Sequence, residues 1–176
     1  MKRLASTIRL RGEVSSRTYA EDLLTRPGDG VIVRRGVLRS FVLACPDGCG
    51  DVLTINLDKR AGPAWRIYLD RRGLSLYPSV WRDSGCGSHF IVWRNRILWC
   101  DTSDESDVEF ADDLSLDARV LDALNEKTFT SHELLADAIG ELPWEVQQVC
   151  KRLVRKGLIV RARGTKRQEY RLRRPR

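Results

Sequence analysis

The sequence predicts an α+β chain with two parts, an N-terminal mainly-β domain stabilised by zinc and a C-terminal winged helix-turn-helix domain. Short alternating apolar segments before residue 100 indicate strands, and Cys and His residues cluster on Gly-rich turns between them. After residue 115 the apolar residues take helical spacing and end in a hairpin pattern. A length of 176 residues allows two small domains.

Charge divides the chain into three parts. Residues 1–100 hold 17 basic and 9 acidic side chains, and residues 115–176 hold 14 and 8. Between them, residues 101–114 contain seven acidic side chains and no basic one, which predicts a linker between domains 1–100 and 115–176. The acidic stretch would alternatively cover a basic face of a neighbour. The net charge of +7 admits an anionic partner.

Several protein classes are disfavoured by the sequence. No run approaches the ~20 apolar residues that span a bilayer, and the basic start lacks the apolar stretch of a secretory signal. We therefore expect a cytoplasmic protein without disulfides. The chain has no P-loop, no dinucleotide glycine pattern and no nucleophile elbow, so an independent hydrolase or oxidoreductase is the weakest functional class.

The first domain is expected to be almost entirely β. Ser15 or Ser16 caps one short helix, which Pro27 and the glycines after it end. Residues 94–96 suit a tight hairpin. The strands are expected over 7–11, 31–33, 37–44, 52–57, 65–69, 74–77, 90–93 and 97–99.

The second domain is expected to hold three helices and a hairpin. The first helix covers 116–126, the second begins after Thr130 or Ser131 and ends at Gly140, and the third has Pro143 in its first turn. A hairpin then runs out through 158–160, turns near 164–165 and returns through 170–172. This order resembles the winged helix-turn-helix superfamily.

Two Gly-flanked motifs predict one structural zinc ion. Cys45 and Cys49 flank a turn after a strand, and Cys86 and His89 form a Cys-x2-His motif. Our preferred ligands are Cys45, Cys49, Cys86 and His89, because each motif then supplies a pair. Cys100 can replace His89 and give four thiolates.

A catalytic zinc is disfavoured, because the first domain lacks a His-Glu-x-x-His helix and a second histidine. The other histidine of the chain, His132, belongs to the second domain. If Cys100 does not bind the metal, it becomes a candidate nucleophile for group transfer. A buried thiol is the simpler interpretation of Cys100.

One set of motifs resembles a known family. They are Cys45-Pro46-Asp47-Gly48-Cys49-Gly50, Asn56-Leu57-Asp58, Ala61-Gly62-Pro63-Ala64-Trp65, Tyr77-Pro78-Ser79-Val80-Trp81, Gly85-Cys86-Gly87-Ser88-His89-Phe90 and Trp99-Cys100. Over about residues 31–100 the chain resembles bacterial proteins of unknown function that are encoded beside ubiquitin-like conjugation genes. Those genes typically specify modifiers, an activating enzyme, a conjugating enzyme and a JAB-type metalloprotease.

The resemblance implies a zinc-binding accessory factor of such a system, either E3-like or a substrate adaptor. The expected partners are an E2-like conjugating enzyme or a ubiquitin-like modifier. The family supplies no catalytic residues to transfer, so the resemblance adds only the metal ligands.

The third helix and the hairpin of the second domain are basic. The amide and cationic side chains of the third helix are expected to face away from its apolar stripe, and with the basic hairpin they suit base and phosphate contacts in double-stranded DNA. Many winged helices dock proteins instead, so both interpretations stay open. The candidate binding residues are Gln147, Gln148, Lys151, Arg152, Arg155, Arg161, Arg163, Lys166 and Arg167. The alternative function is therefore a DNA-binding regulator with a structural zinc domain.

Overall fold

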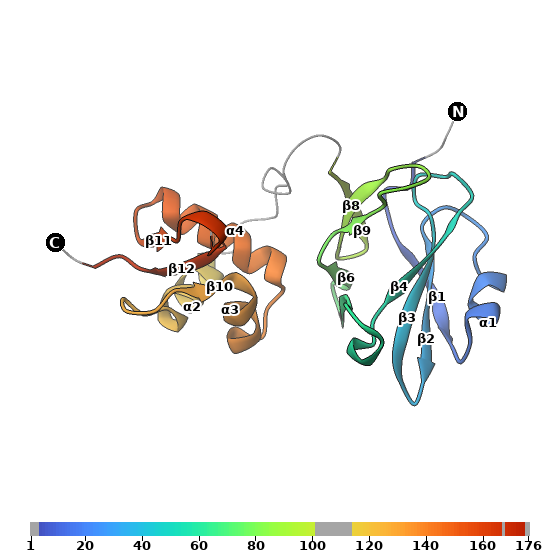
Figure 1. The fold of residues 1–176 in the computed structure, drawn as a ribbon, viewed down its shortest axis with the longest axis horizontal. Coiled ribbons are helices and arrows are strands. Elements are labelled where there is room, and N and C mark those ends of the chain that lie inside the picture. Colours follow the sequence, from blue (N-terminus) through green and yellow to red (C-terminus); the bar gives the residue numbers. More distant parts are fainter. Residues whose placement is uncertain (1–3, 101–113, 167, 175–176) are drawn as a thin grey trace. The chain divides into compact units, whose positions relative to one another are not determined.

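The computed structural model describes residues 4–100, 114–166 and 168–174. The chain divides into two compact units, Met1–Glu105 and Ser106–Arg176 (Figure 1). Unit 1 consists of strands with one short helix, and unit 2 contains most of the helix, so the expected mixed α+β class is confirmed. The predicted linker lies outside the described residues except for Leu114, which begins a helix. The predicted domain bounds stay a prediction.

A four-stranded sheet with the order β1-β2-β3-β4 forms one side of unit 1. Its strands are β1 (Arg9–Val14), β2 (Asp29–Arg35), β3 (Val37–Ala44) and β4 (Val52–Asn56). β1 and β2 are parallel, and α1 (Arg17–Asp22) lies in the connection between them. The expected cap is confirmed, because the Ser16 side chain accepts a hydrogen bond from the Tyr19 amide.

Two smaller sheets complete unit 1. β5 (Arg66–Asp70) pairs with β6 (Gly73–Tyr77), and β7 (Val80–Trp81), β8 (His89–Trp93) and β9 (Arg96–Trp99) form a three-stranded sheet in that order. The tight hairpin between β8 and β9 is confirmed: Arg94 and Asn95 have φ of 50° and 64°. The short strand β7 was not predicted.

The core of unit 1 joins all three sheets. Gly30 lies directly over the Phe41 ring, where a Cβ atom would approach the ring to 2.2 Å, so no larger residue fits at position 30. On the opposite face, Ala20 of α1 covers apolar side chains of β2 and β3. The core residues are Ile8, Ile32, Phe41, Leu43, Ile55, Leu74, Leu76, Val80, Phe90, Val92 and Ile97.

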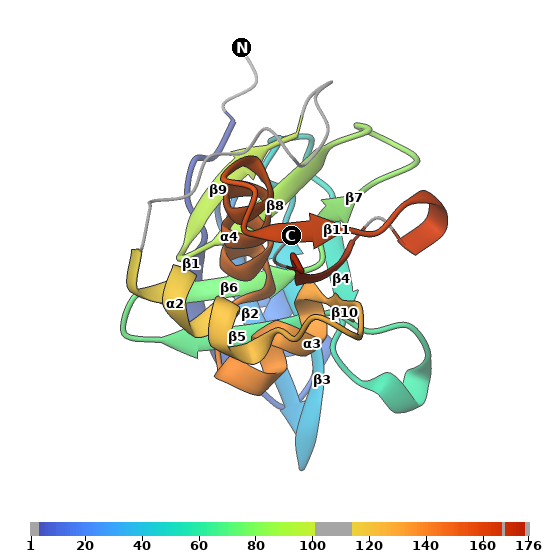
Figure 2. The same cartoon turned by 90° about the vertical axis from the view of Figure 1, so that its left-hand side faces the viewer.

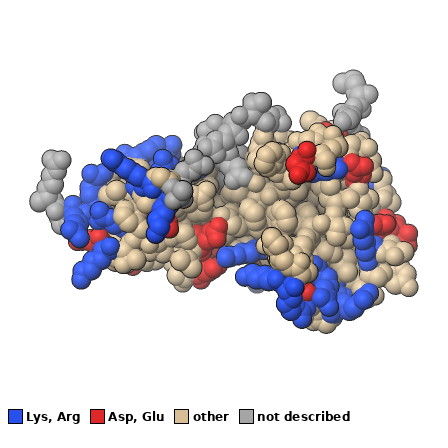
Figure 3. Space-filling model, viewed as in Figure 1, with Lys and Arg blue, Asp and Glu red and all other residues tan. Residues whose placement is uncertain are grey.

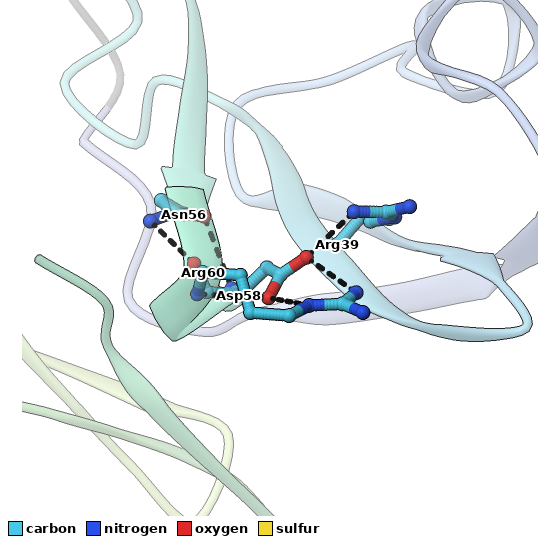
Figure 4. Close-up of polar contacts among 4 residues, drawn as sticks. All are labelled: Arg39, Asn56, Asp58 and Arg60. Carbon is cyan, nitrogen blue, oxygen red and sulfur yellow. Dashed lines mark hydrogen bonds and ion pairs between the residues drawn. The ribbon is translucent and has the colours of Figure 1, made fainter. Parts of the chain in front are cut away.

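A polar cluster fixes the segment after β4 (Figure 4). Asp58 accepts hydrogen bonds from the guanidinium groups of Arg39 and Arg60, and these bonds hold the pKa of its carboxyl well below the usual value. The Asn56 side chain donates to the carbonyl of Pro63 over 2.9 Å. The backbone carbonyl of Asn56 accepts from the Trp65 amide over 2.8 Å. The cluster thereby positions Trp65 at the start of the second sheet.

Unit 2 contains three helices and a small sheet. The helices are α2 (Leu114–Ala123), α3 (His132–Ile139) and α4 (Pro143–Arg155). The sheet has the order β10-β12-β11, from β10 (Thr130–Ser131), β11 (Ile159–Arg161) and β12 (Glu169–Leu172). β11 packs against α4, and the two are labelled in Figure 2.

The local signals of unit 2 act as expected. The Ser131 side chain caps α3 by accepting from the Leu134 amide, and Gly140 ends α3 with a φ of 69°. Pro143 lies at the start of α4. The three helices and the hairpin of β11 and β12 follow the predicted order, whereas β10 was not predicted. The assignment to the winged helix-turn-helix superfamily stays a prediction.

Within the described ranges, no helix has both the length and the apolar character that crossing a membrane requires.

Candidate functional site

The β7–β8 hairpin carries the residues of greatest chemical interest. Ser79 immediately precedes β7, and His89 is the first residue of β8. The strands are antiparallel, with Trp81 opposite His89. Because side chains alternate along a strand, Ser79, Trp81 and His89 point to the same face of the hairpin, and Ser79 is a diagonal neighbour of His89.

Ser79 and His89 form a hydrogen-bonded pair. The distance from Ser79 Oγ to His89 Nε2 is 3.0 Å, and both side chains are half-buried, so a substrate can reach them. The Ser79 carbonyl accepts a hydrogen bond from the Trp65 indole over 3.1 Å. A serine hydroxyl held against an imidazole nitrogen is the arrangement by which histidine activates a serine nucleophile.

Trp81 flanks this pair. Its ring centroid lies 5.9 Å from that of His89, and 71% of the residue is exposed, which is unusual for a tryptophan. A cavity of about 220 Å³ borders His89 and is also lined by Asp47, Ser88 and Trp99. His89 thus has the exposed Trp81 ring beside it and borders a small cavity whose lining does not include Ser79.

Three cysteines converge where the β3–β4 and β7–β8 connections meet. The sulfur atoms of Cys45, Cys49 and Cys86 all lie within 4.8 Å of one another. Cys45 follows β3, and its amide donates to the Asp51 carbonyl over 2.8 Å, which closes the turn that holds Cys49. All five cysteines of the chain are free thiols.

The thiol geometry fits a tetrahedral metal ion. Zinc–sulfur bonds of about 2.3 Å at tetrahedral angles place two sulfurs ~3.8 Å apart. The distance from Cys45 Sγ to Cys86 Sγ is 3.7 Å. This group of cysteines can therefore hold a metal ion, and thiolate donors favour zinc among the common candidates.

Arg82 supplies positive charge to the same cluster. Its Nη1 atom lies 3.2 Å from Cys86 Sγ and 3.6 Å from Cys49 Sγ. The same atom donates to the Asp51 carboxylate over 2.9 Å. Arg82 therefore offsets the negative charge that clustered thiolates carry.

The three thiols differ in acidity. Burial is the main cause that raises the pKa of Cys45, to about 11. Burial also acts to raise the pKa of Cys86, but hydrogen bonds from the side chain and backbone of Ser88 and from the other thiols outweigh it and bring the pKa to about 7. Cys86 is thus the most acidic of these groups for which a shift is resolved.

The structure does not bring the two candidate fourth ligands into the thiol group. His89 Nε2 contacts Ser79 instead, and Cys100 is a buried residue whose sulfur lies 3.9 Å from the Leu98 carbonyl. The cavity beside His89 also reaches Cys100. The identity of a fourth ligand, and a role of Cys100 as a nucleophile, stay predictions.

The candidate binding residues of unit 2 differ in exposure. Arg155, Arg161, Arg163 and Lys166 are exposed, and Lys and Arg side chains are prominent on the face of unit 2 seen in Figure 3. Gln148, Lys151 and Arg152 are half-buried, Gln147 is buried, and Arg167 lies outside the described residues.

The structure corrects the expected orientation of Arg152. Its Nε atom lies 3.2 Å from Oδ1 of Asp117 in α2, and the Arg152 side chain is only 14% exposed. Lys156 Nζ contacts the same carboxylate over 3.0 Å. Helical spacing placed Arg152 opposite the apolar stripe of α4, but its charge is satisfied by the neighbouring helix.

The sequence reasoning did not identify Ser79 as a partner of His89. No local signal pointed to Ser79, because the run Val80-Trp81 is too short for a periodic strand pattern. The register that places Trp81 opposite His89 brings Ser79 to the His89 ring. The Cys-x2-His spacing predicted a metal-binding role for His89 instead.

Comparison with known families now bears on this site. Residues 16–100 match the family model described as bacterial ubiquitination-like system serine protease (BubE). The match links this chain to bacterial ubiquitin-like systems, as its sequence motifs indicated, and suggests an accessory role there. No curated protein and no solved structure matches the chain.

Proposed function

We propose that this chain is a serine hydrolase of a bacterial ubiquitination-like system, with Ser79 as the nucleophile and His89 as the general base. The hydrogen bond of 3.0 Å between Ser79 Oγ and His89 Nε2 carries the proposal. It lies inside residues 16–100, the segment that matches a family model described as a serine protease. The description and the geometry agree on the type of nucleophile.

The chemistry follows from the two side chains. His89 Nε2 takes the hydroxyl proton as Ser79 Oγ attacks a carbonyl carbon of the substrate. The same proton then passes to the leaving group as its bond to that carbon breaks, which leaves an ester on Ser79. A water molecule, deprotonated by His89, attacks the ester, and Ser79 recovers its proton as the acid product leaves.

The substrate class is a peptide or isopeptide bond of a ubiquitin-like modifier. The match to a protease within a ubiquitination-like system supports this choice. The half-buried position of both side chains suits an extended segment better than a folded surface. We therefore place the chain at the trimming of a modifier precursor or at the removal of a modifier from its target.

The metal site has a structural role in this proposal. Cys45, Cys49 and Cys86 would hold a zinc ion, and zinc would supply a cross-link between the β3–β4 and β7–β8 connections. Cys86 lies three positions before His89, and the Ser88 hydroxyl contacts Cys86 Sγ over 3.2 Å. The cysteines thus fix the end of the loop from which His89 emerges.

A labelling experiment tests the nucleophile without knowledge of the substrate. The full chain is incubated with a fluorophosphonate probe, and the modified residue is located by peptide mass spectrometry. We expect one labelled site, Ser79. Ser79→Ala should abolish labelling, whereas Ser84→Ala, which changes an exposed serine of the same hairpin, should label as the wild type does.

A substrate experiment follows. The modifier precursor of the same system is incubated with the chain, and cleavage is followed by mass spectrometry. Ser79→Ala should reduce the rate by about 10³-fold or more, because it removes the nucleophile. Labelling of another serine, or equal cleavage by the Ser79→Ala variant, would refute the assignment.

A recruiting function for unit 2 is the second candidate, and the exposed cations of its hairpin favour it. In this role the chain serves as an E3-like factor or adaptor that docks an E2-like enzyme or modifier, or it binds double-stranded DNA through unit 2. The adaptor role predicts co-elution with the conjugating enzyme or modifier that persists in Ser79→Ala. DNA contact predicts binding to mixed-sequence duplex that weakens steeply with salt.

A further inference from the structure

The outer edge of the β7–β8–β9 sheet is open at Trp81, the residue opposite His89. β7 pairs with β8 on one side, and within the described ranges no strand pairs with its other side (Figure 2). An open edge presents backbone donors and acceptors that another extended chain can pair with.

The direction of the free backbone groups follows from the ladder. The Arg82 amide donates to the Ser88 carbonyl over 2.9 Å, and the Cys100 amide donates to the His89 carbonyl over 2.9 Å. In an antiparallel ladder these groups alternate in direction. The backbone groups of His89 therefore face β9, and those of its opposite residue Trp81 face away from β8, toward the open edge.

Trp81 uses neither of its outward backbone groups elsewhere. Among the residues that the structure describes, no hydrogen bond involves the Trp81 amide or carbonyl. At the preceding outward-facing residue of the same edge, Ser79, the backbone carbonyl already accepts a hydrogen bond from the Trp65 indole over 3.1 Å. The edge is thus closed beside Ser79 and opens at Trp81.

The Trp81 side chain completes the surface. Its ring lies on the face that holds Ser79 and His89, close to the His89 ring, and 71% of the residue is exposed. Ser79 lies two positions before Trp81 along the extended chain, a span of about 7 Å. A peptide paired with Trp81 would therefore pass within one or two residues of the nucleophile.

We propose that an extended peptide segment, the substrate strand, binds as an added β-strand at the Trp81 edge of β7. One residue of the segment exchanges two hydrogen bonds with the Trp81 amide and carbonyl, and the indole covers an adjacent side chain. The proposed function adds that the bound segment is cleaved at Ser79. The docking itself does not use the Ser79 hydroxyl. Trp81 is thus a positioning residue rather than a catalytic one.

Two variants at one position test the pairing. Trp81→Pro removes both the indole ring and the outward amide without breaking a bond to β8, which proline at an edge permits. Trp81→Val keeps the amide and removes the ring. The probe is a synthetic peptide of the C-terminal twelve residues of the modifier from the same system, and its affinity is measured by calorimetry with each variant in a Ser79→Ala background.

Both variants lose the ring, so Trp81→Pro should bind the peptide about tenfold more weakly than Trp81→Val because it also loses one backbone bond. Amide hydrogen exchange at Trp81 should slow when the peptide binds to the Ser79→Ala chain. Equal affinity in Trp81→Pro, together with unchanged exchange at Trp81, would overturn the proposal.

A peptide series gives a measurement that does not depend on the folding of a variant. Single N-methyl groups are placed at successive peptide bonds, and each peptide is tested against the Ser79→Ala chain. Added-strand binding predicts that one position loses about tenfold in affinity, where the peptide amide donates to the Trp81 carbonyl. A series without any such position would contradict it.

The two proposals fail separately. If the fluorophosphonate probe labels Ser79 but the peptide leaves Trp81 exchange unchanged, the hydrolase stands and edge docking falls. If the peptide slows exchange at Trp81 but no probe reacts with Ser79, edge docking stands and the hydrolase falls.

Discussion

The thiol cluster includes Cys86 of the loop between β7 and β8, and the Ser79–His89 pair lies on the two sides of the same hairpin, yet the two sites arise from different kinds of information. The thiols belong to short motifs in which glycines and the spacing of the cysteines indicate a turn whose side chains converge. The Ser79–His89 pair depends on the register of two strands, which no local motif encodes. The spacing of residues in the sequence can reveal a site within one turn. A site formed across two strands can be found only when the pairing of those strands is known.

The sharpest test of this comparison is the role of His89, which the Cys-x2-His motif would give to the metal. His89→Gln should lower hydrolysis of the modifier precursor by about 10²–10⁴-fold, because it removes the base. Zinc content, measured by mass spectrometry of the metal in purified protein, should be the same as in the wild type. A loss of zinc from this variant would return His89 to the metal site.

The next largest effect concerns the thiol cluster itself. Cys86→Ser should reduce zinc content and lower the midpoint of thermal unfolding of unit 1 by about 10–20 °C, since binding energy at such a site is folding energy. Labelling of Ser79 should decline as well, because Cys86 anchors the loop that leads to His89.

The matched control for the cluster is Cys100→Ala, which removes a buried thiol that the cluster does not include. It should keep the zinc content of the wild type. If Cys100→Ala loses zinc while Cys86→Ser retains it, the three-thiol assignment is wrong.

A smaller effect is expected at the ion pair that the helical spacing failed to reveal. Burial alone would raise the pKa of Asp117, but hydrogen bonds from Arg152 and Lys156 outweigh it and hold the pKa below the usual value. A carboxyl whose pKa is lowered by folding stabilises the fold at pH values above its pKa in the unfolded chain, which is about 3.9. This contribution is lost as the pH falls through the lower pKa that the carboxyl has in the folded chain.

Asp117→Asn should therefore destabilise unit 2 by about 1–3 kcal/mol near neutral pH, and the difference from the wild type should narrow below about pH 4. Hydrogen exchange of peptides from α4 measures this effect. Asp122→Asn, an exposed acid on the same helix, is the control and should change little. A constant difference across the pH range would argue against the ion pair.

The smallest effect concerns the exposed hairpin of unit 2. Arg161→Gln with Arg163→Gln should reduce the salt dependence of binding to duplex DNA and leave the unfolding midpoint unchanged, since both side chains are exposed. Lys59→Gln with Arg71→Gln removes the same charge from exposed positions of unit 1 and should have no effect on DNA binding. Equal losses in both pairs would indicate a general charge effect.

Much of the fold was predictable because its signals are local. Ser16 and Ser131 cap helices as expected, and the turn at Arg94 and Asn95 forms where the sequence placed a hairpin. The strand β7 was missed because its two residues are too few for a periodic pattern. With β7 missing, the register of β8 and the position of Ser79 could not be inferred.

The same limit explains the error at Arg152. Periodicity along α4 identifies the apolar stripe correctly, as Val146, Val149 and Leu153 are buried. It cannot show which charged residue finds an acid on another helix, because Asp117 lies 35 positions earlier in the sequence. The thiols of Cys45 and Cys86 are 41 positions apart but were found, since each carries its own local motif.

The shortness of β7 also bears on self-association through the sheet edge. A long, flat edge invites a second copy of the same chain to pair with it, and repeated pairing leads to aggregates. An edge of two residues offers too few bonds to hold a partner without further contacts. In the edge docking that we propose, the segment would also contact Trp81 and the Ser79–His89 pair, whereas a second copy of the chain would find an edge too short to act as a template for polymerisation.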